Sequence, residues 1–111
     1  MRPWPLLLAL ACVGIAGNRA LAGQLSIEIL VQEGTPVGGA RAVRVVRNDE
    51  VALTVRSDRD DELHLHGYNL HLKLKRGEPG TLRFTATRSG RFSAELHKSH
   101  SEVVVFEIYP K

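Results

Sequence analysis

Histidine is the residue type in this sequence with the clearest capacity for chemistry. Five histidines lie between positions 64 and 100, and four of them form two close pairs, His64 with His66 and His97 with His100. Neutral imidazole is the commonest side-chain metal ligand and suits both copper and zinc. Two such pairs, brought together by the fold, could supply up to four nitrogen ligands to one metal ion.

The strands expected around these residues determine where the rings can point. His64 and His66 alternate with leucines, so both rings should project from one face of a strand, about 6.5–7 Å apart along the chain. His97 and His100 lie at and just beyond the end of another expected strand, where a loop can turn both rings toward one point. Paired histidines on a strand also often decorate a solvent-exposed face, and this is the interpretation we give to His71. Spacing alone leaves metal binding and surface decoration both open.

An enzyme is the weakest of the functional classes that the sequence suggests. His97, Ser99, His100 and Ser101 bring hydroxyls and imidazoles together, but there is no nucleophile elbow, and proximity in a loop does not build a base with an orienting partner. The His-Glu-x-x-His spacing of zinc proteases is absent. We therefore expect a protein that is not an enzyme.

An apolar period of two runs through almost the whole chain after Gly23, which predicts strands and no helix. Seven or eight short strands with turn signals every eight to twelve residues are typical of an all-β sandwich or barrel. The pattern leaves open whether residues 23–39 form an edge strand or a loosely docked arm. The expected strands lie within residues 25–29, 43–46, 51–55, 63–66, 70–75, 82–86, 92–96 and 103–109, with loops at 34–39, 57–62, 77–80 and 97–101 and turns at 48–49 and 89–90.

The first 22 residues have the pattern of a cleavable signal peptide. Arg2 precedes an apolar run over residues 6–16, and Ala20-Leu21-Ala22 is a small-x-small cleavage site before Gly23. The run is short for a membrane span, which needs about 20 residues. An uncleaved anchor and a lipoprotein attached at Cys12 are the alternatives. We expect export to the periplasm or beyond the cell, with residues 23–111 as one domain and no membrane attachment after cleavage.

Cleavage at this site would remove all sulfur from the protein. Cys12 is the only cysteine and Met1 the only methionine, so the mature domain would have no disulfide and no thiolate or thioether ligand. Removal of residues 1–22 also leaves 13 basic and 12 acidic side chains, a net charge of +1. An exported protein with so even a charge balance is not expected to bind nucleic acid. We interpret the basic patch of Lys73, Lys75 and Arg76 as a solvated strand end.

Three motifs in the second half of the chain occur in a recognisable order: ELHLHGY at 62–68, GEPGTLRFTA at 77–86 and SGRF at 89–92. With their spacing, residues 51–109 resemble a cupredoxin domain of the bacterial periplasmic kind and the copper domain of cytochrome oxidase subunit II. The resemblance implies a small Greek-key β-sandwich that binds copper.

The ligands implied by the resemblance are only partly present. His64 or His66 matches the first histidine of the family, and His100 matches the second, with His97 as a closer candidate. Leu96 occupies the position of the family's cysteine, and no methionine follows. A type 1 blue-copper centre needs a thiolate, which Leu96 cannot supply, so blue-copper electron transfer is excluded for the mature chain.

Two functions remain. One is an all-nitrogen copper site for copper handling, formed by His64, His66, His97 and His100, with copper as the expected ligand. Three glutamates lie near these histidines and could add an oxygen ligand, namely Glu62, Glu95 and Glu102. The alternative is a metal-free, degenerate cupredoxin that acts as an interaction module for a periplasmic protein partner.

Overall fold

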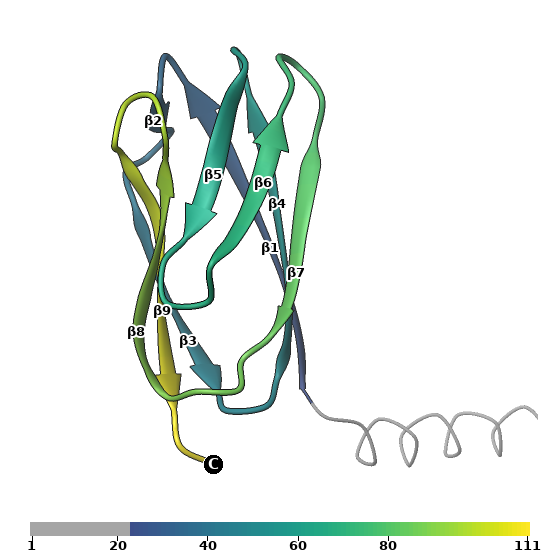
Figure 1. Ribbon diagram of the computed structural model, residues 1–111, viewed down its shortest axis with the longest axis vertical. Helices are drawn as coiled ribbons and strands as arrows, with labels where there is room; N and C mark the ends of the chain where they lie inside the picture. Colours follow the sequence, from purple (N-terminus) through teal and green to yellow (C-terminus); the bar gives the residue numbers. More distant parts are fainter. Residues whose placement is uncertain (1–22) are drawn as a thin grey trace, which may run out of the picture.

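The computed structural model describes residues 23–111, which form two β-sheets packed face to face (Figure 1). The predicted signal peptide, with Met1 and Cys12, lies outside the described residues. Within these residues, no helix has the length and apolar character needed to cross a membrane. The strands are β1 (Gln24–Gln32), β2 (Thr35–Pro36), β3 (Arg41–Val46), β4 (Glu50–Ser57), β5 (Asp61–Leu65), β6 (Leu70–Leu74), β7 (Gly80–Thr85), β8 (Gly90–Leu96) and β9 (Glu102–Tyr109).

The two sheets have the orders β2-β1-β4-β7 and β3-β9-β8-β5-β6. Strand β1 runs parallel to β4 and β3 runs parallel to β9, whereas the other pairs are antiparallel. The chain passes repeatedly from one sheet to the other, as a Greek-key sandwich requires. The all-β prediction is therefore confirmed. The additional strand is β2, a two-residue pairing inside the expected loop at 34–39.

The core lies between the sheets and is built from every second residue of each strand, the one whose side chain points inward. Leu53 of β4, Leu63 and Leu65 of β5, Leu96 of β8 and Phe106 of β9 are all fully buried. Burial of a side chain of this size contributes about 1.5–3 kcal/mol. Since successive residues of a strand point to opposite faces, burial of these leucines directs their polar neighbours to the solvent.

The segment whose role the sequence left open is an integral strand. Strand β1 lies inside its sheet, between β2 and β4, and its register with β4 extends from Gln24 to Val31. Ile27, Ile29 and Val31 are buried in the core. A loosely docked arm is excluded.

The expected loop at 57–62 is shorter than the sequence indicated. Ser57 closes β4, and β5 already begins at Asp61, which is only 7% exposed. The Asp61 carboxylate accepts hydrogen bonds from the backbone amides of Glu62 and Lys98, at 2.7 and 3.0 Å. Both amides bond Oδ1, whereas Oδ2 is buried without a partner among the described residues. The two amides therefore offset part of the cost of burying an acidic residue at the start of the strand.

Replacement of Leu96 by alanine tests how much this core contributes to stability. Leu96 has no exposed surface, so Leu96→Ala should lower the free energy of unfolding by about 2–5 kcal/mol. Urea denaturation followed by circular dichroism measures the change. Leu30→Ala is the matched control, because Leu30 is 45% exposed and its truncation should cost about 0.5 kcal/mol or less. Equal losses in the two variants would contradict the assigned core.

Candidate functional site

Three histidines and two glutamates gather on the solvent-facing side of the five-stranded sheet, and we call this group the histidine face: Glu62, His64, His66, His71 and Glu95. His64 on β5 lies directly opposite His71 on β6 and Glu95 on β8. The buried pair Leu63–Leu96 fixes the register between β5 and β8, and the partly buried Leu70 and Leu72 on β6 lie opposite Leu65 and Leu63. The sequence prediction that His64 and His66 share a face is therefore confirmed.

The imidazole rings lie closer together than the backbone spacing alone would place them. The ring centroids of His64 and His66 are 4.3 Å apart, and the planes are tilted by 51°. His64 and His71 stack at 4.2 Å with only 6° between their planes. The spacing expected along the strand was about 6.5–7 Å, so the side chains lean toward each other.

The position of His64 in the middle of this stack makes its ring difficult to protonate. Partial burial, followed by the neighbouring His71 and His66, lowers the pKa of His64 below its ordinary value of 6.5. Glu62 and Glu95 act in the opposite direction but are smaller effects. At neutral pH the ring is therefore uncharged, which is the state in which an imidazole binds metal.

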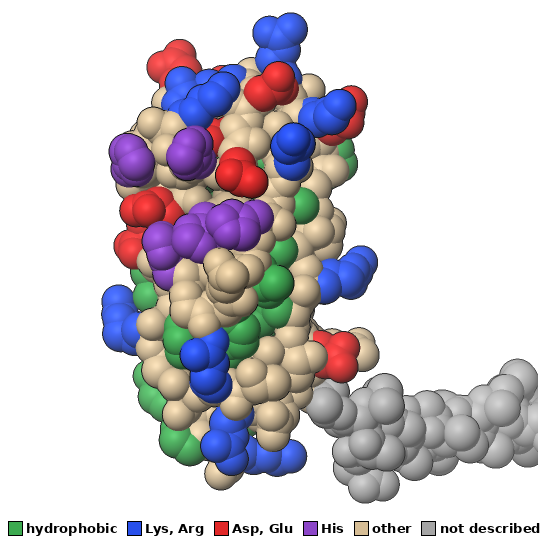
Figure 2. All heavy atoms as spheres, in the orientation of Figure 1, with side chains coloured by type: hydrophobic (Ala, Val, Ile, Leu, Met, Phe, Trp, Pro, Cys, Tyr) green, Lys and Arg blue, Asp and Glu red, His purple; other side chains and the backbone are tan. Residues whose placement is uncertain are grey.

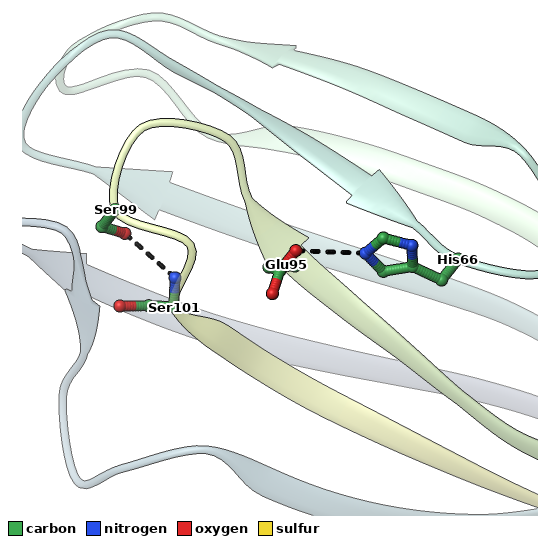
Figure 3. Close-up of polar contacts among 4 residues, drawn as sticks. All are labelled: His66, Glu95, Ser99 and Ser101. Carbon is green, nitrogen blue, oxygen red and sulfur yellow. Dashed lines mark hydrogen bonds and ion pairs between the residues drawn. The ribbon is translucent and has the colours of Figure 1, made fainter.

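Two carboxylates border the stack. The Nε2 atom of His66 lies 3.2 Å from Oε1 of Glu95 (Figure 3). The Nδ1 atom of His71 lies 4.0 Å from Oε2 of Glu62. These side chains are partly exposed, so each contact contributes little to stability. Their chemical effect is to bring oxygen donors within reach of a group of nitrogen donors.

The second predicted histidine pair lies on the turn between β8 and β9. The backbone amide of His97 donates to the carbonyl of Glu62 at 2.8 Å, which places His97 beside one border of the histidine face. His100 lies further along the turn in the left-handed region, with φ of 61°, and its amide donates to the carbonyl of Leu96. Figure 2 shows histidine side chains in two groups on the same side of the molecule.

Among residues 23–111, no group of three or more His, Cys, Asp or Glu side chains is already arranged to hold a metal ion. The stack explains part of this, because the in-plane lone pairs of near-parallel rings do not converge on one point. At least one ring must rotate before two of them can reach a common metal at about 2 Å. His71 is exposed enough to do so. The set of His64, His66, His97 and His100 stays a prediction.

The residues do not fit the buried copper site that the resemblance implies. Leu96, at the position of the cysteine, pairs with Leu63, and both are fully buried in the core. His64 is the next residue after Leu63 and points to the opposite face of the sheet. A side chain at position 96 and an imidazole at position 64 therefore could not bind one ion, even if residue 96 were a cysteine.

The serines near the second pair have a structural role in the turn. The hydroxyl of Ser99 donates to the carbonyl of Gly34 at 2.7 Å and accepts a hydrogen bond from the backbone amide of Ser101 at 3.3 Å (Figure 3). These contacts tie the β8–β9 turn to the β1–β2 turn.

The sequence interpretation missed the contribution of His71. The prediction that it faces solvent is confirmed, but His71 also stacks on His64. The available signal was the four-residue connection between Leu65 and Leu70. A hairpin closed by those two leucines sets His64 opposite His71.

Comparisons with known proteins agree on the fold. No family model and no curated protein sequence matches the chain. Among solved structures, the multicopper oxidase mgLAC matches with a TM-score of 0.60 and 16% identity over 80% of this chain and 40% of its own. The blue copper oxidase from Nitrosomonas europaea gives a TM-score of 0.62 and 14% identity over 79% of this chain and 39% of its own.

A third structure matches over nearly its whole length. A chain of a heme-copper terminal oxidase dimer gives a TM-score of 0.57 and 17% identity over 96% of this chain and 94% of its own. In contrast, the protein spans only about 40% of the length of the two oxidases above. Together these matches show that the described chain has a cupredoxin-like fold, and the resemblance found in the sequence is confirmed.

The stacked arrangement predicts an unusual titration of His64. In a pH titration of the imidazole resonances by NMR, His64 should titrate below 6.5. His71→Ala should raise its midpoint by removing a neighbouring positive charge, while leaving it below 6.5, since burial is the larger cause. The unfolded chain binds a proton at His64 more readily than the folded chain does. The contribution of His64 to folding stability is therefore complete above pH 6.5, and it decreases as the pH falls toward the lowered pKa of the folded state. A midpoint at or above 6.5 would contradict the stacked geometry.

Proposed function

We propose that this chain is an exported copper-handling protein that binds copper on the histidine face rather than in a buried cupredoxin site. The observation that carries the proposal is the clustering of His64, His66 and His71, with adjacent ring centroids 4.2–4.3 Å apart. Glu95 and Glu62 border the cluster. We further propose that the protein acts in the periplasm or outside the cell, as the sequence of residues 1–22 suggests.

The chemistry of the donors supports copper among the common metals. Imidazole and carboxylate ligands suit Cu(II), which binds such sites more tightly than the other divalent first-row metals do. The lowered pKa of His64 supports binding at neutral pH, because little proton release is needed there.

The exposure of the site favours transfer of the ion over electron transfer. A buried type 1 centre holds its copper through a thiolate in a rigid pocket, and Leu96 offers no such ligand. Ligands on an open sheet face can bind and release an ion by rotating their side chains. We therefore propose copper delivery or buffering, and a binding protein rather than an enzyme.

A second candidate function is a metal-free interaction module. It is favoured by the match with nearly the whole of one chain of a heme-copper terminal oxidase dimer, since that protein is a multichain assembly. The buried Leu96 is consistent with it, because a leucine at that position fills the core where a ligand would otherwise be. In this case the histidine face would be a polar surface without a bound ion.

Calorimetric titration with Cu(II) near pH 7.5 distinguishes the two functions. The purified protein should bind one ion with a dissociation constant of about 1 μM or tighter, and binding should weaken as the pH falls below about 6.5, where free imidazole becomes protonated. The triple variant His64→Ala, His66→Ala, His71→Ala should lose at least about tenfold in affinity, or 1.4 kcal/mol.

The double variant His97→Ala, His100→Ala is the matched control on the neighbouring turn. Unchanged binding in this variant supports the histidine face as the site. If both variants lose copper equally, the four histidines predicted from the sequence are favoured as the ligands. The proposal that the histidine face alone binds copper would then be wrong. Absence of saturable binding in the unaltered protein would reject copper handling in favour of the interaction module.

A further inference from the structure

At one end of the sandwich, the carboxylates of three aspartates accept hydrogen bonds from backbone amides of neighbouring loops. The carboxylates of Asp58, Asp60 and Asp61 accept hydrogen bonds of 2.8–3.1 Å from amides in the β1–β2, β6–β7 and β8–β9 turns. Figure 1 shows that these turns and the β4–β5 loop meet at one end of the molecule. None of these three carboxylates forms an ion pair with a cation among the described residues.

Three cations from three different loops surround a pocket at this end. Arg59, Arg76 and Lys98 line a space of about 320 Å³, and Asp60 is the fourth lining residue, which gives the lining a net charge of +2. None of the three cations forms an ion pair within residues 23–111. The same end of the surface carries several other charged side chains of both signs (Figure 2), but the pocket itself is predominantly basic.

Arg59 is held in place by its surroundings. Its guanidinium packs closely against Gly34, which has φ of +80°, so that a side chain at position 34 would collide with it. The hydrogen bond from Ser99 to the Gly34 carbonyl holds that turn in position. The Nε atom of Arg59 is buried and has no hydrogen-bond partner among the described residues. Oδ2 of Asp61 is likewise buried without a hydrogen-bond partner. Buried polar atoms without a partner are rare, and a bound water or ion is one explanation for them.

We propose that this loop pocket binds an oxyanion, meaning a carboxylate or phosphate group. Guanidinium groups match the planar, bidentate geometry of such anions, and lysine adds a point charge. Asp60 offsets only part of the charge of the three cations, so a bound anion relieves their mutual repulsion in addition to forming its own contacts. The pocket is open to solvent, so binding should be weak and strongly reduced by salt.

The test is an NMR titration with inorganic phosphate, at low ionic strength, of protein that has been freed of metal with EDTA and then exchanged into a buffer without EDTA. Amide shifts in the three loops should saturate with a dissociation constant of about 10 mM or lower, and the constant should rise at least about threefold at 0.15 M salt. Arg76→Gln and Lys98→Gln should each weaken binding by about threefold or more. Shifts that increase linearly with phosphate and never saturate would overturn the proposal.

Arg83→Gln is the matched control, because Arg83 is an exposed arginine on β7 that does not line the loop pocket. If Arg83→Gln weakens binding as much as Arg76→Gln and Lys98→Gln do, only the overall charge matters. That result would also overturn the proposed site. A pentaglutamate peptide distinguishes the two sources of the anion. Saturation at a concentration at least about tenfold below that of phosphate indicates an acidic protein segment, and saturation with phosphate alone indicates a free anion. Since no copper is present, the result is independent of the histidine face.

Discussion

The pairing of β5 with β8 is the constraint on which the rest of the site depends. Leu63 lies opposite Leu96 in the core, and the two-residue period of a strand then sends His64 and Glu95 to the outer face. A slip of one residue would exchange these positions and bury the imidazoles, which the core does not allow. The same register therefore explains both the exposed histidine face and the burial of Leu96 at the position that corresponds to the cysteine of cupredoxins.

Much of the fold could be predicted from the sequence, because burial follows the apolar period. The strands around Leu53, Leu63 and Leu96 were found by alternation alone. The start of β5 was missed because Asp61 is a buried acid, and its stability depends on an amide from Lys98, far away in the sequence. Local patterns carry no signal for such a contact.

The candidate site was harder to predict than the fold. The sequence placed His64 and His66 on one face, since that depends only on the period of the strand. The stack with His71 depends on hairpin register, and the position of His97 beside Glu62 depends on how β8 pairs with β5. The resemblance to cupredoxins indicated which residues correspond to ligands, but not that position 96 and His64 face opposite sides of a sheet.

Glu62 borders the histidine face and a cavity that shares Asp60 and Lys98 with the loop pocket. Its side chain faces His71 on the histidine face, and it also lines a neighbouring cavity with Lys73, His97 and Lys98. A divalent cation at the histidine face would draw the Glu62 charge toward it and add positive charge near the loop pocket. Both effects favour an anion in that pocket, and by linkage a bound anion would favour the cation to the same degree. With surface charges screened over about 8–10 Å in physiological salt, this coupling is strongest at low ionic strength.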